Sequence, residues 1–323
     1  MTITVVAEYH DAPAEGVNVV SRTLIDDLVA SGLSVRIIDP SKVLQHLPRL
    51  IFNPSKMTVF THGPGRRTVL ASLILRLFSA TRITWVATRP DLALLPNWLR
   101  GKRTAHAVIC NRNRPDLKSA ALDAKTVVQP IGIAPERIAA SGAKLWEDRK
   151  TTGVPIAVHV GHLRQSRGLE HLAKIKKQLG DQVAIIVVAS PYFEPESGVM
   201  EMLNDAGVVV EHGFISSIAD VYLSADLYLF PAPPASEGAI EMPLSVIEAI
   251  ACSLPVISTP FGALPEALAD VSGVHFAEPQ SFAETVVKAI NELNTLRAPD
   301  GLPSHLNAHQ ISERVKELYE DFL

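Results

Sequence analysis

Cysteine is scarce in this chain of 323 residues, which contains only Cys110 and Cys252. Two cysteines in apolar surroundings cannot form the disulfide framework of a small secreted domain, so we interpret both as core thiols. Such scarcity is typical of proteins that fold in a reducing compartment. We therefore expect a cytoplasmic protein.

Long hydrophobic runs are missing as well. No stretch reaches the roughly 18 consecutive apolar residues of a membrane-spanning helix, and the most hydrophobic helical segment, Val69 to Phe78, is interrupted by Arg76. The segment Met1–Val6 has a strand pattern without the basic region of a signal peptide. The sequence predicts neither a membrane span nor a cleaved leader.

Several motifs of nucleotide and metal sites are also absent. No Gly-x-Gly-x-x-Gly follows the first apolar run, and Gly63-Pro64-Gly65 lacks the third glycine and the lysine of a P-loop. A nicotinamide site and a Walker-type NTPase both lose support. Because no His/Cys cluster has metal-ligand spacing and no Asp-x-Asp triplet occurs, we expect neither a bound metal nor another cofactor.

Charge is divided unevenly along the chain. The whole sequence has 30 Lys and Arg against 34 Asp and Glu, a net charge of −4. Residues 1–145 hold 19 basic and 10 acidic residues, a net charge of +9, whereas residues 146–323 hold 11 and 24, a net charge of −13. The near-neutral total hides a basic half, which would attract anionic partners, and an acidic half.

Short apolar runs alternate with helical periods twice along the chain, which predicts parallel sheets covered by helices. The first series of predicted strands is Thr2–Ala7, Ser34–Ile38, Met57–Thr61, Ile83–Ala87, Ala107–Cys110 and Thr126–Gln129, with helices at Gly16–Ala30 and Thr68–Ser79. The second series has strands Ile156–Val160, Val183–Ala189, Val208–Val210, Leu227–Phe230 and Val256–Ser258, with helices Gly168–Leu179, Leu244–Ala251 and Ala308–Phe322.

Residues 139–154 show no clear strand period and are interpreted as a linker. With 47% hydrophobic residues and this length, the chain predicts two α/β domains, each a doubly wound parallel sheet, that face one cleft. We place the first domain at residues 1–145, the second at 146–305 and a closing C-terminal helix at 306–323.

Two turns between a predicted strand and a predicted helix could hold a phosphate, because free N–H groups at a helix N-terminus favour anions. The first, Glu8–Gly16, ends in Gly16; the alternative is an ordinary loop glycine. The second, Gly161–Gly168, has His162 and Arg167 beside the helix start. Arg167 and backbone N–H groups could hold a diphosphate there, and the alternative is a solvated basic loop.

The segment Glu237–Thr259 contains the most specific pattern. A helix that starts near Pro243 places Glu248 on its second turn, among Ala, Ile, Val and Leu. A carboxylate in such surroundings is costly unless it is paired or bound to a ligand. The alternative is a glutamate on the wet edge of the helix.

This segment resembles the nucleotide-sugar signature of retaining GT-B glycosyltransferases of family 4 (glycosyl transferase group 1). Four further segments are similar to motifs of that family: Gly161–Gly168, Phe261–Glu266, Gly213-Phe214 with Tyr222–Leu227, and Ile131–Ile138. The terminal Arg314–Leu323 resembles the closing helix of the family. The resemblance implies a GT-B fold, with two Rossmann-like domains that face a central cleft.

The resemblance also implies roles for individual residues. Glu248 would bind the donor ribose hydroxyls, Arg167 would neutralise the leaving diphosphate, and His162 could donate a hydrogen bond to it. The Gly16 backbone would approach the phosphate from the N-terminal domain. Gly161, Leu244 and Ser245 complete the expected donor site.

The sequence departs from the family pattern at two places. The first glutamate of the signature falls on Ile240, so Glu241 or Glu237 could bind the donor sugar, with Glu241 favoured. The active-site histidine of the family is replaced in Thr88-Arg89-Pro90-Asp91, where Arg89 or His62 could line the acceptor side. His10, in the first turn, could also contact the acceptor.

We therefore expect a retaining, metal-independent glycosyltransferase that uses a nucleoside diphosphate sugar and an acceptor hydroxyl on a glycan, a lipid-linked or a small molecule. The basic first domain favours an anionic acceptor and could contact the inner surface of a membrane. We expect no nucleic-acid partner. The alternatives are a non-catalytic sugar-nucleotide-binding or scaffold protein and a GT-B sugar-nucleotide epimerase.

Overall fold

The computed structural model of the chain describes residues 2–7, 16–61, 66–79, 81–87, 105–109, 126–191, 193–213, 215, 217–234 and 240–321. The chain forms two compact units. The first unit comprises Met1–Ala134, Ile240–Met242 and His305–Leu323, and the second comprises Pro135–Ala239 and Pro243–Ser304.

The first unit is built on a parallel sheet with the strand order β2-β1-β3-β4-β5-β6. Its described strands are β1 (Thr2–Val6), β2 (Ser34–Ile38), β3 (Met57–Phe60), β4 (Arg82–Ala87), β5 (Ala105–Ile109) and β6 (Thr126–Val128). The central strands β1 and β3 are almost entirely buried, because helices cover both faces of a parallel sheet. In the centre of the sheet, Val5 of β1 lies between Ile37 of β2 and Val59 of β3.

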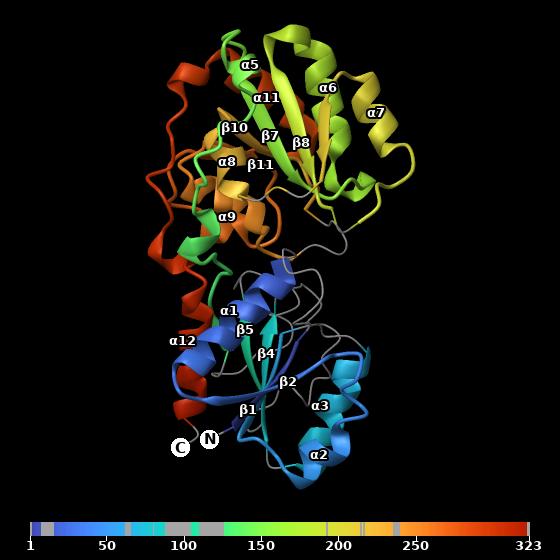
Figure 1. The fold of residues 1–323 in the computed structure, drawn as a ribbon, viewed down its shortest axis with the longest axis vertical. Helices are drawn as coiled ribbons and strands as arrows, with labels where there is room; N and C mark the ends of the chain where they lie inside the picture. The colour runs from blue at the N-terminus through green and yellow to red at the C-terminus, as the bar shows by residue number, and fades with distance from the viewer. Residues whose placement is uncertain are drawn as a thin grey trace. The chain divides into compact units, whose positions relative to one another are not determined.

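The helices of this unit lie on both faces of its sheet. The helices in its described part are α1 (Gly16–Ala30), α2 (Leu47–Phe52), α3 (Arg66–Phe78) and α12 (His309–Glu320). Right-handed crossovers place α1 on one face, and α2 and α3 together on the other (Figure 1). The sequence does not predict α2, because six residues with a proline at the start are too few to show a helical period.

The C-terminal segment returns to the first unit and completes it. Helix α12 packs against α1, and Asp27 of α1 accepts hydrogen bonds from His309 Nδ1 at 2.8 Å and Ser312 Oγ at 2.5 Å. At the start of the segment, a Cβ on Gly132 would lie 1.8 Å from the carbonyl oxygen of Leu306. Only glycine therefore allows the two backbones to approach this closely.

The second unit repeats this architecture, with a parallel sheet in the order β12-β11-β10-β7-β8-β9. Its strands are β7 (Ile156–Gly161), β8 (Ala184–Ala189), β9 (Val209–His212), β10 (Leu227–Phe230), β11 (Val256–Ser258) and β12 (Val274–Phe276). Its helices are α5 (Glu147–Lys150), α6 (Leu169–Leu179), α7 (Val199–Asp205), α8 (Ile218–Leu223), α9 (Leu244–Ala251), α10 (Leu264–Ala267) and α11 (Phe282–Asn291).

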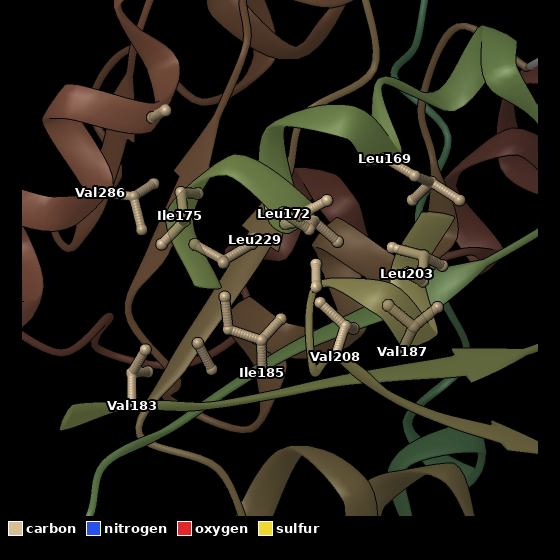
Figure 2. Packing of buried hydrophobic residues seen from close by; sticks show 14 of the residues in the cluster. Leu169, Leu172, Ile175, Val183, Ile185, Val187, Leu203, Val208, Leu229 and Val286 are labelled. Atoms are coloured by element: carbon tan, nitrogen blue, oxygen red, sulfur yellow. The ribbon is translucent and has the colours of Figure 1, made fainter. Parts of the chain in front are cut away.

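The core of the second unit lies between its sheet and the helices α6, α7 and α11. Figure 2 shows Leu172 and Ile175 of α6 above Ile185 of β8 and Leu229 of β10, with Val286 of α11 beside them. Each of these five side chains is fully buried or nearly so. Helices α8 and α9 pack against each other on the opposite face (Figure 1).

The two doubly wound parallel sheets confirm the predicted α/β class. The bounds of α1, β2, β10, α9 and β11 are those predicted, and the other predicted elements are found within a few residues. The sequence did not predict β12 or the helices α5, α7, α8, α10 and α11, of which α5 lies in the segment interpreted as a linker. No helix in the described part of the chain is both long and apolar enough to cross a membrane.

The Asp27 contacts predict a stabilising role for the C-terminal helix. Replacing Asp27 with alanine removes hydrogen bonds from two side chains of α12, so we expect the free energy of unfolding to fall by about 1–2 kcal/mol. The exposed neighbour Asp26 is the control, and Asp26→Ala should have the smaller effect. Equal unfolding free energies in urea for Asp27→Ala and the wild type would contradict the prediction.

Candidate functional site

The strand order of the second sheet points to one place on its edge. The chain leaves β7 toward β8 on one side and leaves β10 toward β11 on the other, although β7 and β10 are neighbours. Ligands of doubly wound sheets bind at the carboxyl ends of two such strands. Two segments follow these ends: the turn between β7 and α6, and the segment that leads from β10 to α9.

The turn from β7 to α6 has a defined backbone path. Gly161 ends β7, a 3₁₀ turn follows at Gln165–Arg167, and Gly168 precedes α6. Gly168 has φ +69°, and a Cβ there would lie 2.3 Å from the carbonyl oxygen of Pro231, just after β10. Any other residue would clash, so glycine brings the start of α6 against the end of β10.

The backbone of this turn is held by the segment that follows β8. Ser190 N–H donates to the carbonyl oxygen of Gly161 at 3.2 Å, and Glu196 N–H donates to that of Leu163 at 2.8 Å. The Glu196 carboxylate accepts from the N–H of Gln165 at 2.9 Å. Three hydrogen bonds therefore fix the backbone of the turn against its neighbour.

Two side chains of the same turn, His162 and Arg164, pack against the ring of Phe193. The His162 ring packs on it at 4.5 Å between centroids, and the Arg164 guanidinium lies 5.4 Å from its centroid. Aromatic contacts of this kind restrict the orientation of both side chains.

Arg167 is the buried cation of this turn. The residue is only 8% exposed, and it stands two positions before the first residue of α6, near the positive end of the helix dipole. A fixed guanidinium beside free helix N–H groups is suited to bind phosphate oxygens. The predicted residues Gly161, His162 and Arg167 are thus brought together at the end of β7.

His159 lies beneath this turn and was not predicted as a site residue. Burial, assisted by the positive charge of Arg167, lowers the pKa of its imidazole to about 4. Its Nδ1 donates to the carbonyl oxygen of Leu229 at 2.8 Å. Its Nε2, a hydrogen-bond acceptor in this tautomer, has no partner in the described part of the chain, and a Cβ on Gly161 would lie 2.9 Å from it.

Glu248 lies on α9 with its side chain 2% exposed. One carboxylate oxygen forms an ion pair with Arg137 Nε, and the other accepts a hydrogen bond from the Tyr222 hydroxyl at 2.7 Å. Burial and the charge of Glu248 raise the pKa of Tyr222. The buried carboxylate is thus paired within the protein, as its apolar surroundings require.

Tyr228 connects α9 to the end of β7. It forms a hydrogen bond with Ser245, and its hydroxyl lies 3.5 Å from the carbonyl oxygen of Val160. Leu244, the first residue of α9, is buried. Leu244, Ser245 and Glu248 therefore share an edge of the sheet with the β7–α6 turn.

The remaining predicted residues fall elsewhere. Gly16 is the first residue of α1 in the first unit and follows β1 in the sequence. The chain leaves β1 toward β2 on one side and leaves the neighbouring β3 toward β4 on the other, so β1 is at the point where the strand order of this sheet reverses. Glu241 is buried and is grouped with the first unit. The predicted residues that lie outside the described part of the chain are His10, His62, Arg89 and Glu237.

Two residues that contact Glu248 were not predicted as site residues, although each lies in a motif recognised in the sequence. Arg137 belongs to the Ile131–Ile138 segment, and Tyr222 begins the Tyr222–Leu227 segment. Their pairing with Glu248 could not be inferred, because it joins residues 111 and 26 positions apart. His159 had no signal, since a histidine within an apolar strand is most often a core residue.

In the described ranges, no group of three or more His, Cys, Asp or Glu residues is placed to hold a metal ion.

Residues 154–292 match the family model described as glycosyl transferases group 1, and this range includes Arg167 and Glu248. The chain is 33% identical over 141 residues to TuaC of Bacillus subtilis (strain 168), which is named as a teichuronic acid biosynthesis glycosyltransferase. It is 24% identical over 224 residues to the sulfoquinovosyl transferase SQD2 of Arabidopsis thaliana. These matches cover 42% and 68% of this chain, but only 33% and 40% of the two relatives.

Among solved structures, the chain is similar to HepE from Anabaena in complex with UDP, with a TM-score of 0.68 at 15% identity over 99% of both chains. The same protein has also been solved with UDP and glucose. At this identity the likeness shows the fold. Together with the two doubly wound sheets, it confirms the GT-B fold that the sequence predicts.

The Glu248 pair predicts a stability effect that a double-mutant cycle can measure. Arg137→Met leaves a buried carboxylate without its cation, so we expect a loss of about 2–4 kcal/mol in the free energy of unfolding. Combining it with Glu248→Gln should cost less than the sum of the two single changes. Breaking the exposed Arg297–Asp300 pair of the same unit with Arg297→Met is the control, with an expected cost below about 0.5 kcal/mol. Additive effects of Arg137→Met and Glu248→Gln would contradict this account.

His159 predicts a pH dependence of stability. Its folded pKa of about 4 lies below the ordinary value of 6.5, so the unfolded chain binds the proton more tightly. Stability should therefore fall as the pH drops from about 6.5 to about 4, by up to about 3 kcal/mol from this residue. In His159→Asn, which can still donate to Leu229, this loss should disappear. Parallel stability profiles for the variant and the wild type, from urea unfolding at pH 4 to 7, would refute this assignment.

Proposed function

We propose that the chain is a glycosyltransferase that moves a sugar from a nucleoside diphosphate sugar to an acceptor hydroxyl. The observation that carries the proposal is the buried Arg167 guanidinium at the start of α6, inside the segment that matches glycosyl transferases group 1. Support also comes from HepE, whose structures contain UDP. The donor would bind chiefly to the second unit.

The proposed role of the β7–α6 turn is to stabilise the leaving group. When the bond between the anomeric carbon and the diphosphate breaks, negative charge accumulates on the diphosphate oxygens. A cation that is already fixed in place stabilises this charge without reorganising during the reaction. Arg167 and the N–H groups at the start of α6 would do so, His162 would donate a hydrogen bond, and the Gly161 backbone would allow close approach. Gly16 would approach the phosphate from the first unit.

Glu248 would bind the ribose hydroxyls of the donor. A carboxylate oxygen has two acceptor lone pairs, and each oxygen of Glu248 uses one for Arg137 or Tyr222. The second lone pairs can accept from two hydroxyl groups while both protein contacts remain. Leu244 and Ser245 at the start of α9 would complete the donor site, and Glu241 or Glu237 would contact the sugar.

Retention of configuration and independence of metals are further parts of the proposal. The sequence contains no convincing nucleophile for a covalent intermediate, so the acceptor would attack from the face that the diphosphate leaves. Arg167 and the helix N–H groups would supply the positive charge that a metal supplies in other glycosyltransferases. The acceptor would be held on the first unit, where His10, His62 and Arg89 are candidates.

The proposal predicts that Arg167→Ala weakens binding of UDP or GDP by at least about tenfold, a loss of about 1.4 kcal/mol or more, because a buried cation is removed from the diphosphate. Calorimetry measures the binding, and Lys174→Ala, on the exposed face of α6, is the matched control. Glu248→Ala should also weaken binding, and donor turnover should survive EDTA. Wild-type affinity in Arg167→Ala and Glu248→Ala would exclude this site. Tight binding without turnover on any acceptor would favour a non-catalytic sugar-nucleotide-binding protein.

A further inference from the structure

A long part of the first unit contains no acidic residue. Between Asp39 and Asp91 the sequence has no Asp or Glu at any position. The same stretch has eight basic residues: Lys42, Arg49, Lys56, Arg66, Arg67, Arg76, Arg82 and Arg89. It includes the helices α2 and α3, so the surface of these helices has charge of one sign only.

The outward face of α3 is apolar where a surface helix is normally polar. Leu70, Leu77 and Phe78 are 45%, 70% and 65% exposed. The opposite face is ordinary, because Ala71 and Leu75 are fully buried against the sheet. Arg66 and Arg67, at the start of the helix, are both exposed.

The end of α2 extends this surface. Ser79, just after α3, donates from its Oγ to the carbonyl oxygen of Leu50 at 3.2 Å, which brings the C-terminal ends of the two helices together. Phe52, the last residue of α2, is 87% exposed. Two basic residues, Arg49 and Lys56, are exposed on either side of it.

We define these eight residues as the α2–α3 surface: Phe52, Leu70, Leu77, Phe78, Arg49, Lys56, Arg66 and Arg67. Figure 1 shows the two helices next to each other on one face of the first sheet. Single exposed apolar residues such as Val29 and Leu223 are common on proteins. A group of four on adjacent helices, surrounded by cations, marks an interaction surface.

We propose that the α2–α3 surface docks on a lipid bilayer that contains anionic lipids. Phe52, Leu77 and Phe78 would enter the boundary between headgroups and acyl chains, as exposed apolar side chains of interfacial helices do. The basic residues would contact the negatively charged headgroups. The absence of acidic residues from positions 40–90 favours this occupant, because the cations of this stretch complement a uniformly anionic plane.

The test is flotation of the full chain with lipid vesicles. Wild-type protein should bind vesicles of phosphatidylcholine with phosphatidylglycerol at least tenfold better than vesicles of phosphatidylcholine alone. Raising the salt concentration from about 0.1 to 0.5 M should weaken this binding, because exposed charges are screened. Equal binding to both vesicle types, or no binding to either, would overturn the proposal.

Two variants separate the apolar and the electrostatic contributions. Phe52→Ser/Leu77→Ser/Phe78→Ser and Arg66→Glu/Arg67→Glu should each reduce binding to the anionic vesicles by about tenfold or more. Val29→Ser, at an exposed position of α1, is the control and should bind like the wild type. Thermal unfolding of each variant checks that the fold is intact. If both variants bind vesicles normally, the proposal is wrong. If they instead abolish a dimer detected by light scattering, the surface is a protein interface and the proposal is also wrong.

Discussion

The carboxylate of Glu248 places a negative charge inside a helix that is otherwise Leu, Ser, Val, Ile and Ala. Such a charge is tolerated only with a partner, and Arg137 supplies it. Arg137 lies in the 3₁₀ turn Pro135–Ile138, where the chain has just entered the second unit. The ion pair therefore attaches the entering segment to α9, and Tyr222 attaches α8 to the same carboxylate.

A second polar anchor holds the segment that follows. Ser141 donates to Asp220 from its backbone and its hydroxyl, and Gly142 N–H donates to the same carboxylate. These hydrogen bonds, the Ser141 hydroxyl first, hold the pKa of Asp220 below its ordinary value. Both anchors use buried carboxylates of the α8–α9 layer. The α8–α9 face of the second sheet is thus tied to the entering segment by polar contacts, whereas the α6–α11 face is held by apolar packing.

The sequence predicted the elements that have a strong local pattern. Helix α1 has buried residues at Val17, Val20, Leu24 and Leu28, and the same spacing marks its bounds in the sequence. Helix α11 has a comparable spacing of buried residues at Phe282, Val286 and Ile290, although no helix was predicted there. The short helices α7 and α8 span at most two turns, so their period cannot be recognised without the sheet beneath them.

The residues of the candidate site also fall into those with a local sequence signal and those without one. Arg167 and Glu248 could be predicted because unusual residues stand at helix starts or in apolar helices. The partners Arg137, Tyr222 and His159 could not, since their positions depend on tertiary contacts between distant segments. The close approach of Gly168 to Pro231 likewise depends on which strands are neighbours, and no local pattern records that.

The return of α12 to the first unit has a consequence for the order of folding. Strands β1 to β6 are synthesised first. The residues that contact Asp27 of α1 and Gly132, which are His309 and Leu306, follow the second unit in the sequence. Contacts of such wide sequence separation close late, because a long loop must be ordered before they form. On the ribosome, the second unit can therefore complete its core while the first still exposes the α1 surface that α12 will cover. The first unit therefore begins to be synthesised before the second but completes its packing after it.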